Sequence, residues 1–294
     1  MFVDKKGDGM KKKLLLASGM IGGVAGFFVG RCVYEMNSLE IVEYEIYSKK
    51  LKEDRKLVFL SDLHDHQFGK ANSVLLDAVR DEAPDAILIG GDMMTCNRKM
   101  DIGDTLELCT YLVQIAPTYY AKGNHELRMR EPEYRRQSTG FSYFLWDMGV
   151  EYLEDYSSML GEDIRITGLD IPKKYYARFL RPSMSDVDIS VKVGRADDRY
   201  FNILLAHVPS FLSAYSRWGA DLVLSGHFHG GLVRLGDRGL ATPDFRMFSP
   251  MVSGMHRMGE TDMIVSAGLG THDINVRINN KPQLVVVHLK KNAI

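Results

Sequence analysis

An acidic and an imidazole side chain stand directly after one of the most apolar runs of the chain. The run, Leu57–Leu60, has the length and composition expected for a strand that is covered on both faces. Asp62 and His64 follow it two residues apart, so in an extended backbone both point to the same side and can meet at one metal ion. Alone the pair is weak evidence, because Asp-x-His also occurs in ordinary surface turns. Its meaning depends on whether other strands end in the same way.

Polar clusters recur at further strand ends along the chain. Apolar runs lead into Asp92, into Asn124 and His125, into His207, and into His227 and His229. Each cluster has an ordinary explanation by itself, such as a capped turn at residues 123–126 or a surface loop for His-x-His. Their recurrence after successive strands instead indicates a metal centre. Imidazole, carboxylate and amide ligands together suit divalent Mn, Fe or Zn better than Ca²⁺ or copper(I).

The elements that must position these side chains are predicted to alternate between strands and helices. Leu39–Lys49 alternates apolar and polar residues and predicts an edge strand. Asn72–Glu82 has apolar residues at helical spacing and lies between the two apolar strands 57–62 and 86–92. This β-α-β unit places Asp62 and Asp92 at the carboxyl ends of parallel strands, where α/β enzymes carry their sites.

Composition narrows the class of protein without naming it. The chain has 294 residues, 45% hydrophobic and 26% charged, which is ordinary for a globular protein with one large α/β core. A net charge of −1 gives no case for nucleic-acid binding, so no nucleic-acid partner is expected. The three cysteines, Cys32, Cys96 and Cys109, are too few for a disulfide framework and have no Cys-x-x-Cys spacing.

The N-terminal region predicts a membrane anchor. Leu14–Gly30 carries no charge and can be lengthened to Tyr34, close to the length of a single transmembrane helix. A cleaved signal peptide is the alternative, but no Ala-x-Ala site follows the run. Lysines precede it and glutamates follow it, which predicts a cytoplasmic tail and an extracytoplasmic domain. We therefore divide the chain into a tail and anchor at 1–37 and a catalytic domain at 38–294.

The ordered polar clusters resemble those of the calcineurin-like metallophosphoesterases. The resemblance extends from about residue 55 to about residue 290, and the segments 253–259 and 266–271 are similar to the bacterial membrane-anchored branch. It implies a four-layer α/β/β/α sandwich with the metal site at the sheet edge. It also implies two divalent ions and their ligands: Asp62, His64, Asp92 and His229 for one ion, and Asp92, Asn124, His207 and His227 for the other, with Asp92 as the bridge. One departure is Met93-Met94-Thr95 after Asp92, where family members often continue with another acidic residue; we expect it to alter the substrate rim and to remove no ligand.

The expected function is a metal-dependent phosphodiesterase at the outer face of the cell membrane. Two divalent ions about 3.5–4 Å apart would clamp the phosphate and lower the pKa of a bridging water for attack on phosphorus. His125 would protonate the departing oxygen or stabilise charge on it. A pyrophosphatase acting on a lipid-linked nucleotide or sugar and a metal-free scaffold of the same fold are the alternatives. The substrate, of lipid or cell-wall type among the candidates, and the oligomeric state stay open.

Two segments between the clusters combine basic and aromatic residues and are candidates for substrate binding. They are Arg128–Trp146 and Lys173–Arg181. Arginines in them could bind additional phosphates, and aromatic residues could lie against anionic headgroups. Exposed amphipathic helices without a ligand would show the same composition, so both interpretations stay open.

Overall fold

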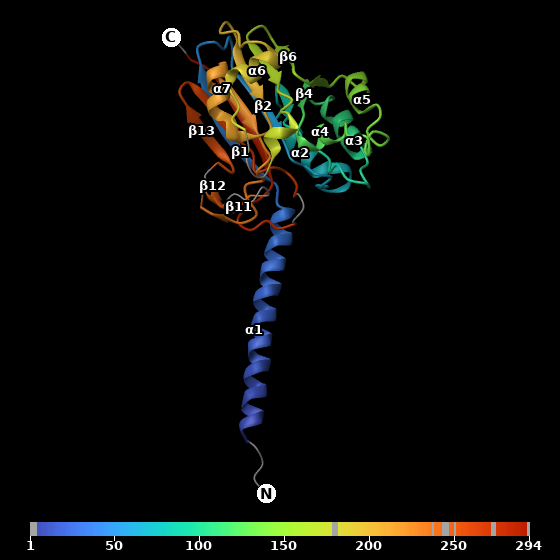
Figure 1. Cartoon of the computed structure of the whole chain (residues 1–294), viewed down its shortest axis with the longest axis vertical. Helices are drawn as coiled ribbons and strands as arrows, with labels where there is room; N and C mark the ends of the chain where they lie inside the picture. The colour runs from blue at the N-terminus through green and yellow to red at the C-terminus, as the bar shows by residue number, and fades with distance from the viewer. Residues whose placement is uncertain are drawn as a thin grey trace.

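Two six-stranded β-sheets lie at the centre of the protein (Figure 1). The structure is a computed structural model that describes residues 5–177, 182–236, 238–242, 247–249, 251–271 and 275–292, with side chains left out at 5–17, 21, 24, 235, 241, 247 and 248. The first sheet has the order β1 (Glu40–Ser48), β15 (Gln283–Lys291), β2 (Arg55–Leu60), β3 (Ala86–Ile89), β4 (Thr118–Ala121) and β5 (Glu151–Leu153). The second has the order β13 (Gly254–Met258), β14 (Thr261–Val265), β9 (Leu222–Ser225), β8 (Phe201–Leu205), β7 (Ile164–Gly168) and β6 (Tyr156–Leu160).

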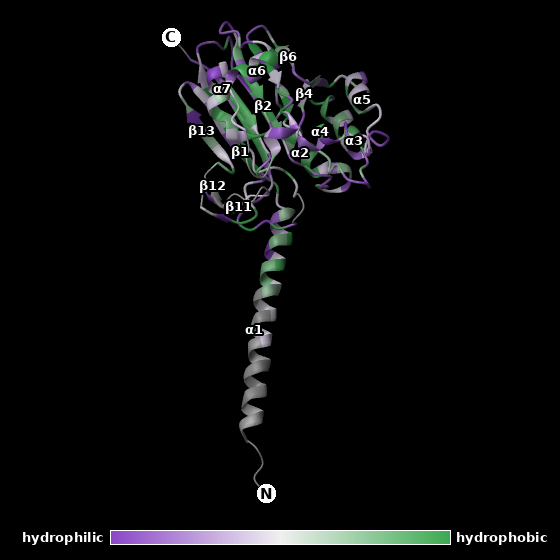
Figure 2. Ribbon diagram, in the orientation of Figure 1, coloured by the Kyte–Doolittle hydropathy of each residue, from purple (hydrophilic) through white to green (hydrophobic). Residues whose placement is uncertain are grey.

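The sheets face each other across an apolar core because their central strands are apolar on both sides. Leu57 and Phe59 of β2 belong to the same core as Ile203 and Leu205 of β8. Figure 2 shows these central strands as mainly hydrophobic. Burying one such side chain contributes about 1.5–3 kcal/mol, so this interface is a major source of stability.

Helices cover the two outer faces of the sheet pair. The alternate residues of β2, Val58 and Leu60, pack in one core cluster with α2 (Ser73–Asp81) and α3 (Gly103–Leu112). On the other side, α6 (Asp186–Val193) and α7 (Leu212–Trp218) pack on the second sheet. The layers therefore follow the predicted order of helix, sheet, sheet and helix. The predicted edge strand 39–49 is β1, which lies at the edge of the first sheet.

The carboxyl ends of the central strands meet at one edge of the sandwich. Strands β2, β3 and β4 are parallel to one another, and so are β8 and β9. Strand β15 is antiparallel to β2 and parallel to β1, so β1 begins at the edge where β2 ends. The helix that precedes β1 therefore leaves the domain from the edge that carries the predicted metal ligands.

That helix, α1 (Lys5–Met36), extends away from the domain (Figure 1). Among the residues whose features are described, no helix combines the length and the apolar character needed to cross a bilayer. The predicted transmembrane anchor thus gains no support here, and its residues 14–17 lie outside the described side chains. The predicted domain boundary after residue 37 falls between the end of α1 and the start of β1 and stays a prediction.

Shorter elements complete the fold near the predicted site. They include α4 (Asn124–Arg128), α5 (Phe141–Asp147) and the 3-10 helices η1 (Lys70–Asn72), η2 (Lys173–Tyr176) and η3 (Pro209–Phe211). A third, three-stranded sheet has the order β10 (Arg234–Leu235), β11 (Arg238–Ala241) and β12 (Met247–Ser249). The sequence did not predict this sheet.

Candidate metal centre

The predicted ligands follow the central strands. Most lie in loops that bend sharply, and Asn124 is the first residue of α4. Five of these residues have positive φ values, in a region that side chains other than glycine rarely adopt: Asp62 at 55°, His64 at 48°, Asp92 at 54°, His227 at 72° and His229 at 50°. Each such residue costs of order 1–3 kcal/mol, and such strain gathers at functional sites. The fold therefore holds these side chains in place against a local preference for other conformations.

Glycines beside the ligands permit the close approach of the loops. Gly91 has φ of 91°, and a Cβ atom there would lie 2.0 Å from the backbone nitrogen of Gly123. A Cβ atom at Gly226 would lie 2.1 Å from Oδ2 of Asp62. The glycines of the Gly-Asp and Gly-His pairs are thus needed so that loops from both sheets can meet.

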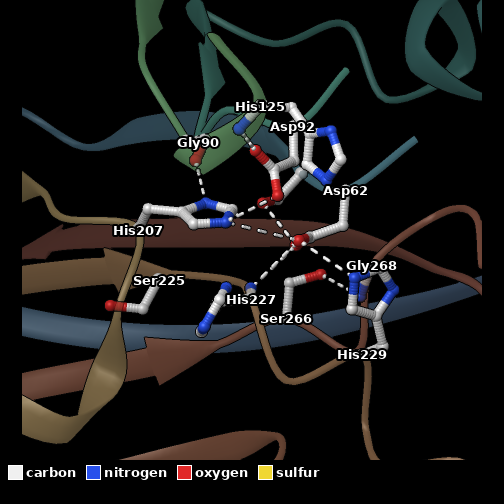
Figure 3. Close-up of polar contacts among 12 residues, drawn as sticks. Asp62, Gly90, Asp92, His125, His207, Ser225, His227, His229, Ser266 and Gly268 are labelled. Carbon is white, nitrogen blue, oxygen red and sulfur yellow. Dashed lines mark hydrogen bonds and ion pairs between the residues drawn. The ribbon is translucent and has the colours of Figure 1, made fainter. Parts of the chain in front are cut away.

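Carboxylates and imidazoles from the two sheets converge at one place (Figure 3). Nε2 of His207 lies 3.1 Å from Oδ2 of Asp92 and 3.6 Å from Oδ1 of Asp62. Nε2 of His229 lies 3.4 Å from Oδ1 of Asp62, and Nε2 of His64 lies 3.7 Å from Oδ2 of Asp92. The structure therefore brings these predicted residues together and buries all five.

Within the part of the chain that the structure describes, three groups of side chains have ligand atoms within 4.8 Å of one another. Asp62, His64 and His229 form one group, and Asp92, His207 and His227 form another. Each group is part of one predicted ligand set: the first lacks Asp92 and the second lacks Asn124. A third group joins His64 and Asp92 to His125, which the sequence did not predict as a ligand.

The ring orientations of two histidines suit metal binding. Nδ1 of His207 donates to the carbonyl of Gly90 at 2.7 Å, and Nδ1 of His229 donates to the carbonyl of Gly270 at 3.1 Å. Because a carbonyl can only accept, each ring keeps its Nε2 atom for the site. Such carbonyl support of a ligating histidine is common around protein-bound metals. Asn124 contributes a buried Oδ1 atom that has no hydrogen-bond partner among the described residues.

The charges of the site suit a cation. Burial raises the pKa of Asp92 to about 7, although His207 nearby opposes this change. Burial lowers the pKa of His207, but the charges of Asp92 and Asp62 outweigh this effect and raise it to about 10. Buried carboxylates that attract protons in this way also attract divalent ions, which displace those protons. The donor set thus fits divalent metal ions.

His125 is held differently from the other histidines. The backbone N–H of Cys96 donates to its Nδ1 atom at 2.8 Å, and the ring lies edge to face with His64 at 4.8 Å between centroids. Thr95, the last residue of the departure from the family pattern, donates its backbone N–H to the carboxylate of Asp65 at 2.9 Å. The contact to the ring of His125 comes from Cys96, the residue that directly follows this departure.

Glu126 is a functional residue whose role the sequence did not reveal. Its carboxylate accepts hydrogen bonds from the backbone N–H groups of Asp92 at 2.9 Å, Met93 at 3.1 Å and Gly123 at 2.9 Å. It also accepts one from the hydroxyl of Tyr120 at 2.7 Å. Glu126 therefore fixes the loop of Asp92 to the loop of Asn124. Its position in Gly-Asn-His-Glu was the available signal, but spacing alone did not show what it binds.

A cavity of about 670 Å³ opens beside these side chains. Its wall includes Arg128, Arg130 and Lys173 from the two basic segments, together with Tyr176. Of these, Arg130 forms ion pairs with Glu154 and Asp170, and Lys173 pairs with Glu131. The aromatic residues of α5, Tyr143, Phe144 and Trp146, are exposed and are not part of this wall.

Three proteins to which this chain is similar in sequence are named metallophosphoesterases or phosphodiesterases, in agreement with the candidate metal centre. Residues 55–231 match the model of the calcineurin-like phosphoesterase family. The chain is 27% identical to the uncharacterized metallophosphoesterase Cj0846 of Campylobacter jejuni over 85% of its own length, and it spans only 63% of that protein. It is 26% identical to the uncharacterized metallophosphoesterase YkuE of Bacillus subtilis, over 94% of this chain and 93% of that one. It is also 24% identical to the phosphodiesterase YaeI of Escherichia coli, over 80% and 82%. The chain belongs to the calcineurin-like phosphoesterases.

Proposed function

We propose that this protein hydrolyses phosphodiesters with the help of two divalent metal ions, Mn, Fe or Zn. The observation that carries the proposal is the convergence of three side chains from both sheets: Nε2 of His207 lies 3.1 Å from a carboxylate oxygen of Asp92 and 3.6 Å from one of Asp62. Family membership and the similarity to a protein named a phosphodiesterase support the reaction type.

The residues would divide between the two ions as the predicted sets do. Asp62, His64 and His229 would hold one, Asn124, His207 and His227 the other, and Asp92 would bind both. When bound, the ions would supply a clamp for the phosphate and a hydroxide nucleophile at neutral pH. The side chains orient the phosphate and the nucleophile. His125 lines the same cavity, where it would donate a hydrogen bond to the phosphate.

The cavity wall supports a substrate that carries an organic group on its phosphate. Arg128 is exposed beside the site and provides positive charge, while Leu127, Pro132 and Tyr176 provide apolar surface. The ring of Tyr176 lies 5.5 Å from that of His227, so a group bound there would lie next to the reacting phosphate. Phosphate monoesters and diesters both offer such a group, and the similarity to a protein named a phosphodiesterase supports the diester.

Metal content and hydrolysis of an aryl phosphodiester test the proposal together. The purified protein should contain two equivalents of metal by elemental analysis and should hydrolyse bis(p-nitrophenyl) phosphate in the presence of Mn²⁺. His207→Ala should lose most of this activity, whereas His288→Ala, which changes a histidine that pairs with Glu43 at the sheet edge, should retain it. A protein that binds no metal would be a scaffold of the same fold, and the proposal would be wrong.

A pyrophosphatase that acts on a lipid-linked nucleotide or sugar is the second candidate. Arg128 in the cavity wall favours it, because a second phosphate would need a cationic partner. The other two cations of the wall, Arg130 and Lys173, already pair with carboxylates. Comparison of kcat/KM for a pyrophosphate diester and for a simple phosphodiester distinguishes the two functions. The pyrophosphatase is correct if Arg128→Ala reduces hydrolysis of the pyrophosphate alone.

A location at the outer face of the cell membrane is a further part of the proposal. The lysines before the apolar stretch and the glutamates after it support this orientation. Helix α1 exposes the apolar side chains of Phe27, Phe28 and Val29, which could contact lipid. Membrane attachment would place the enzyme near phosphate esters of lipids or of the cell wall.

A further inference from the structure

A buried arginine holds together the backbone that lies against the metal centre. Arg277 is 1% exposed. Its Nη2 atom donates to the carbonyls of Ala267 at 2.9 Å, Gly268 at 3.1 Å and Gly270 at 2.5 Å. Burial lowers the pKa of its guanidinium to about 10, so the group stays charged at neutral pH. A planar guanidinium can bind several carbonyls at once, which a lysine cannot do with the same geometry.

The segment that Arg277 binds contacts two predicted ligands. The carbonyl of Gly270 accepts from Nδ1 of His229 at 3.1 Å, and its backbone N–H donates to the carbonyl of Asp62 at 2.6 Å. A Cβ atom at Gly270 would lie 1.8 Å from the carbonyl oxygen of Leu63, so this contact has no space for a larger residue. Arg277 therefore fixes the acceptor that sets the ring of His229.

Asn280 binds the backbone of the same ligand from the other side. Its Nδ2 atom donates to the carbonyl of His229 at 2.7 Å and to that of Gly231 at 2.5 Å. Asn280 is 1% exposed, and its own carbonyl accepts from Nη1 of Arg277 at 3.3 Å. Ring and backbone of His229 thus depend on two residues that do not touch the cavity.

The last turn of α1 completes this arrangement. Glu35 is 1% exposed and accepts a hydrogen bond from the backbone N–H of Asn280 at 2.8 Å. Arg31 donates to its other oxygen at 2.6 Å. The backbone N–H of Arg277 approaches Sγ of Cys32 at 3.2 Å. Helix α1, which otherwise extends away from the domain, is therefore connected to the predicted ligand His229: the buried carboxylate of Glu35 binds Asn280, and Asn280 binds the backbone of His229.

We propose that Arg277 and Asn280 are positioning residues for His229 and that Glu35 makes the end of α1 part of the same support. The proposal rests on the proposed metal-dependent function, because His229 matters there as a ligand of the ion bound by Asp62 and His64. Disturbing α1 at Glu35 should then weaken this ion selectively. The other ion, at His207 and His227, has different backbone support, through Gly90.

Calorimetric titration of the metal-free, full-length protein with Mn²⁺ tests the proposal. Glu35→Ala and Asn280→Asp should each weaken one of the two binding steps by roughly 10–100-fold, the usual effect of losing such support, and leave the other within about threefold. Glu35→Gln keeps an oxygen that can accept from Asn280 and should restore most of the affinity. Glu43→Ala, which removes an exposed glutamate of β1, is the matched control and should change neither step.

The possible results separate this proposal from the function on which it rests. Unchanged titrations of Glu35→Ala and Asn280→Asp would contradict it. So would equal weakening of both steps together with a lower Tm, because that result indicates a general loss of stability. A wild-type protein that binds no Mn²⁺ would overturn the proposed function itself. Selective loss of one step, with rescue by Glu35→Gln, is the result that supports the proposal.

Discussion

The backbone N–H of Cys96 donates a hydrogen bond of 2.8 Å to Nδ1 of His125. A ring nitrogen that accepts a bond has no proton, so the neutral ring carries its proton on Nε2. Such an imidazole can donate a hydrogen bond to a phosphate oxygen, but it lacks the second proton of a strong acid. Of the two roles expected for His125, protonation of the departing oxygen and stabilisation of charge, this relationship favours the second.

Replacement of His125 by Ala should therefore lower kcat by about 10²–10³-fold, as expected for the loss of one donor to a charged transition state. The reduction should be similar for a nitrophenyl ester and an alkyl ester, because stabilisation of phosphate oxygens does not depend on the leaving group. Steady-state kinetics with the two esters, on protein of verified metal content, measures this. A large loss with the alkyl ester alone would show that His125 donates a proton to the departing alkoxide after all.

Asp92 should be the residue whose loss removes both metals. It lies within reach of His64 and of His207, at 3.7 Å and 3.1 Å, so it can contribute to both groups of ligands. We expect Asp92→Ala to contain almost no metal by elemental analysis, and His229→Ala to retain about one equivalent. Asp92→Asn preserves the size of the side chain and should fold while showing the same loss. Two equivalents of Mn²⁺ in either Asp92 variant would refute the bridging role.

Much of the fold could be predicted because its strands are apolar on both faces and short. β2 and β3 end within three residues of Asp62 and Asp92, so the position of these ligands followed from the end of each apolar run. The β-α-β order then required both to lie at one edge. The pairing of β15 between β1 and β2 could not be predicted, because it joins the end of the chain to its beginning.

The supporting residues of the site were hidden for a different reason. Glu126, Arg277 and Asn280 act through backbone N–H and carbonyl groups, and these groups have no signature in the sequence. A buried arginine is unusual, but the sequence around Arg277, between Val276 and Ile278, gives no sign that its side chain is buried. Only the folded structure shows which backbone carbonyls the guanidinium binds.

Replacement of Glu126 by Gln should destabilise the protein and loosen the metal centre together. The carboxylate accepts four hydrogen bonds, two at each oxygen. In Gln one oxygen is replaced by an NH₂ group, which cannot accept the two hydrogen bonds made to that oxygen. We expect a loss of about 2 kcal/mol in the free energy of unfolding, the scale of hydrogen bonds to a charged group. Tyr120→Phe removes only one of the bonds and should cost about 1 kcal/mol. Chemical denaturation measures both, and equal losses would contradict this role for Glu126.

A reporter fused to the C-terminus tests the proposed location. The charge difference across the apolar stretch predicts activity from a reporter that works only outside the cytoplasm. The full-length protein should also stay in the membrane fraction after a high-salt wash, whereas a variant that begins at residue 38 should be released. A signal from a cytoplasmic reporter would reverse the orientation. A shortened N-terminus found by mass spectrometry would favour a cleaved signal peptide.

The stability of the metal-free protein should fall as pH rises. In the folded state the pKa of His207 is raised from 6.5 to about 10, and that of Asp92 from 3.8 to about 7. A group whose pKa is raised by folding stabilises the folded state while it is protonated there. Its contribution to the free energy of unfolding is complete below its pKa in the unfolded chain and is lost above its pKa in the folded protein. For His207 this window is pH 6.5 to about 10.

Metal ions should reverse this trend, because they replace the same protons. The rise in Tm that Mn²⁺ produces should therefore grow between pH 6 and pH 9, and calorimetry in buffers of different ionisation enthalpy should show proton release on binding. His207→Asn should reduce the slope of Tm against pH in the metal-free protein, whereas His288→Ala should leave it unchanged. A metal-free Tm that rises across this range would mean that the buried pair of Asp92 and His207 is not protonated as the structure indicates.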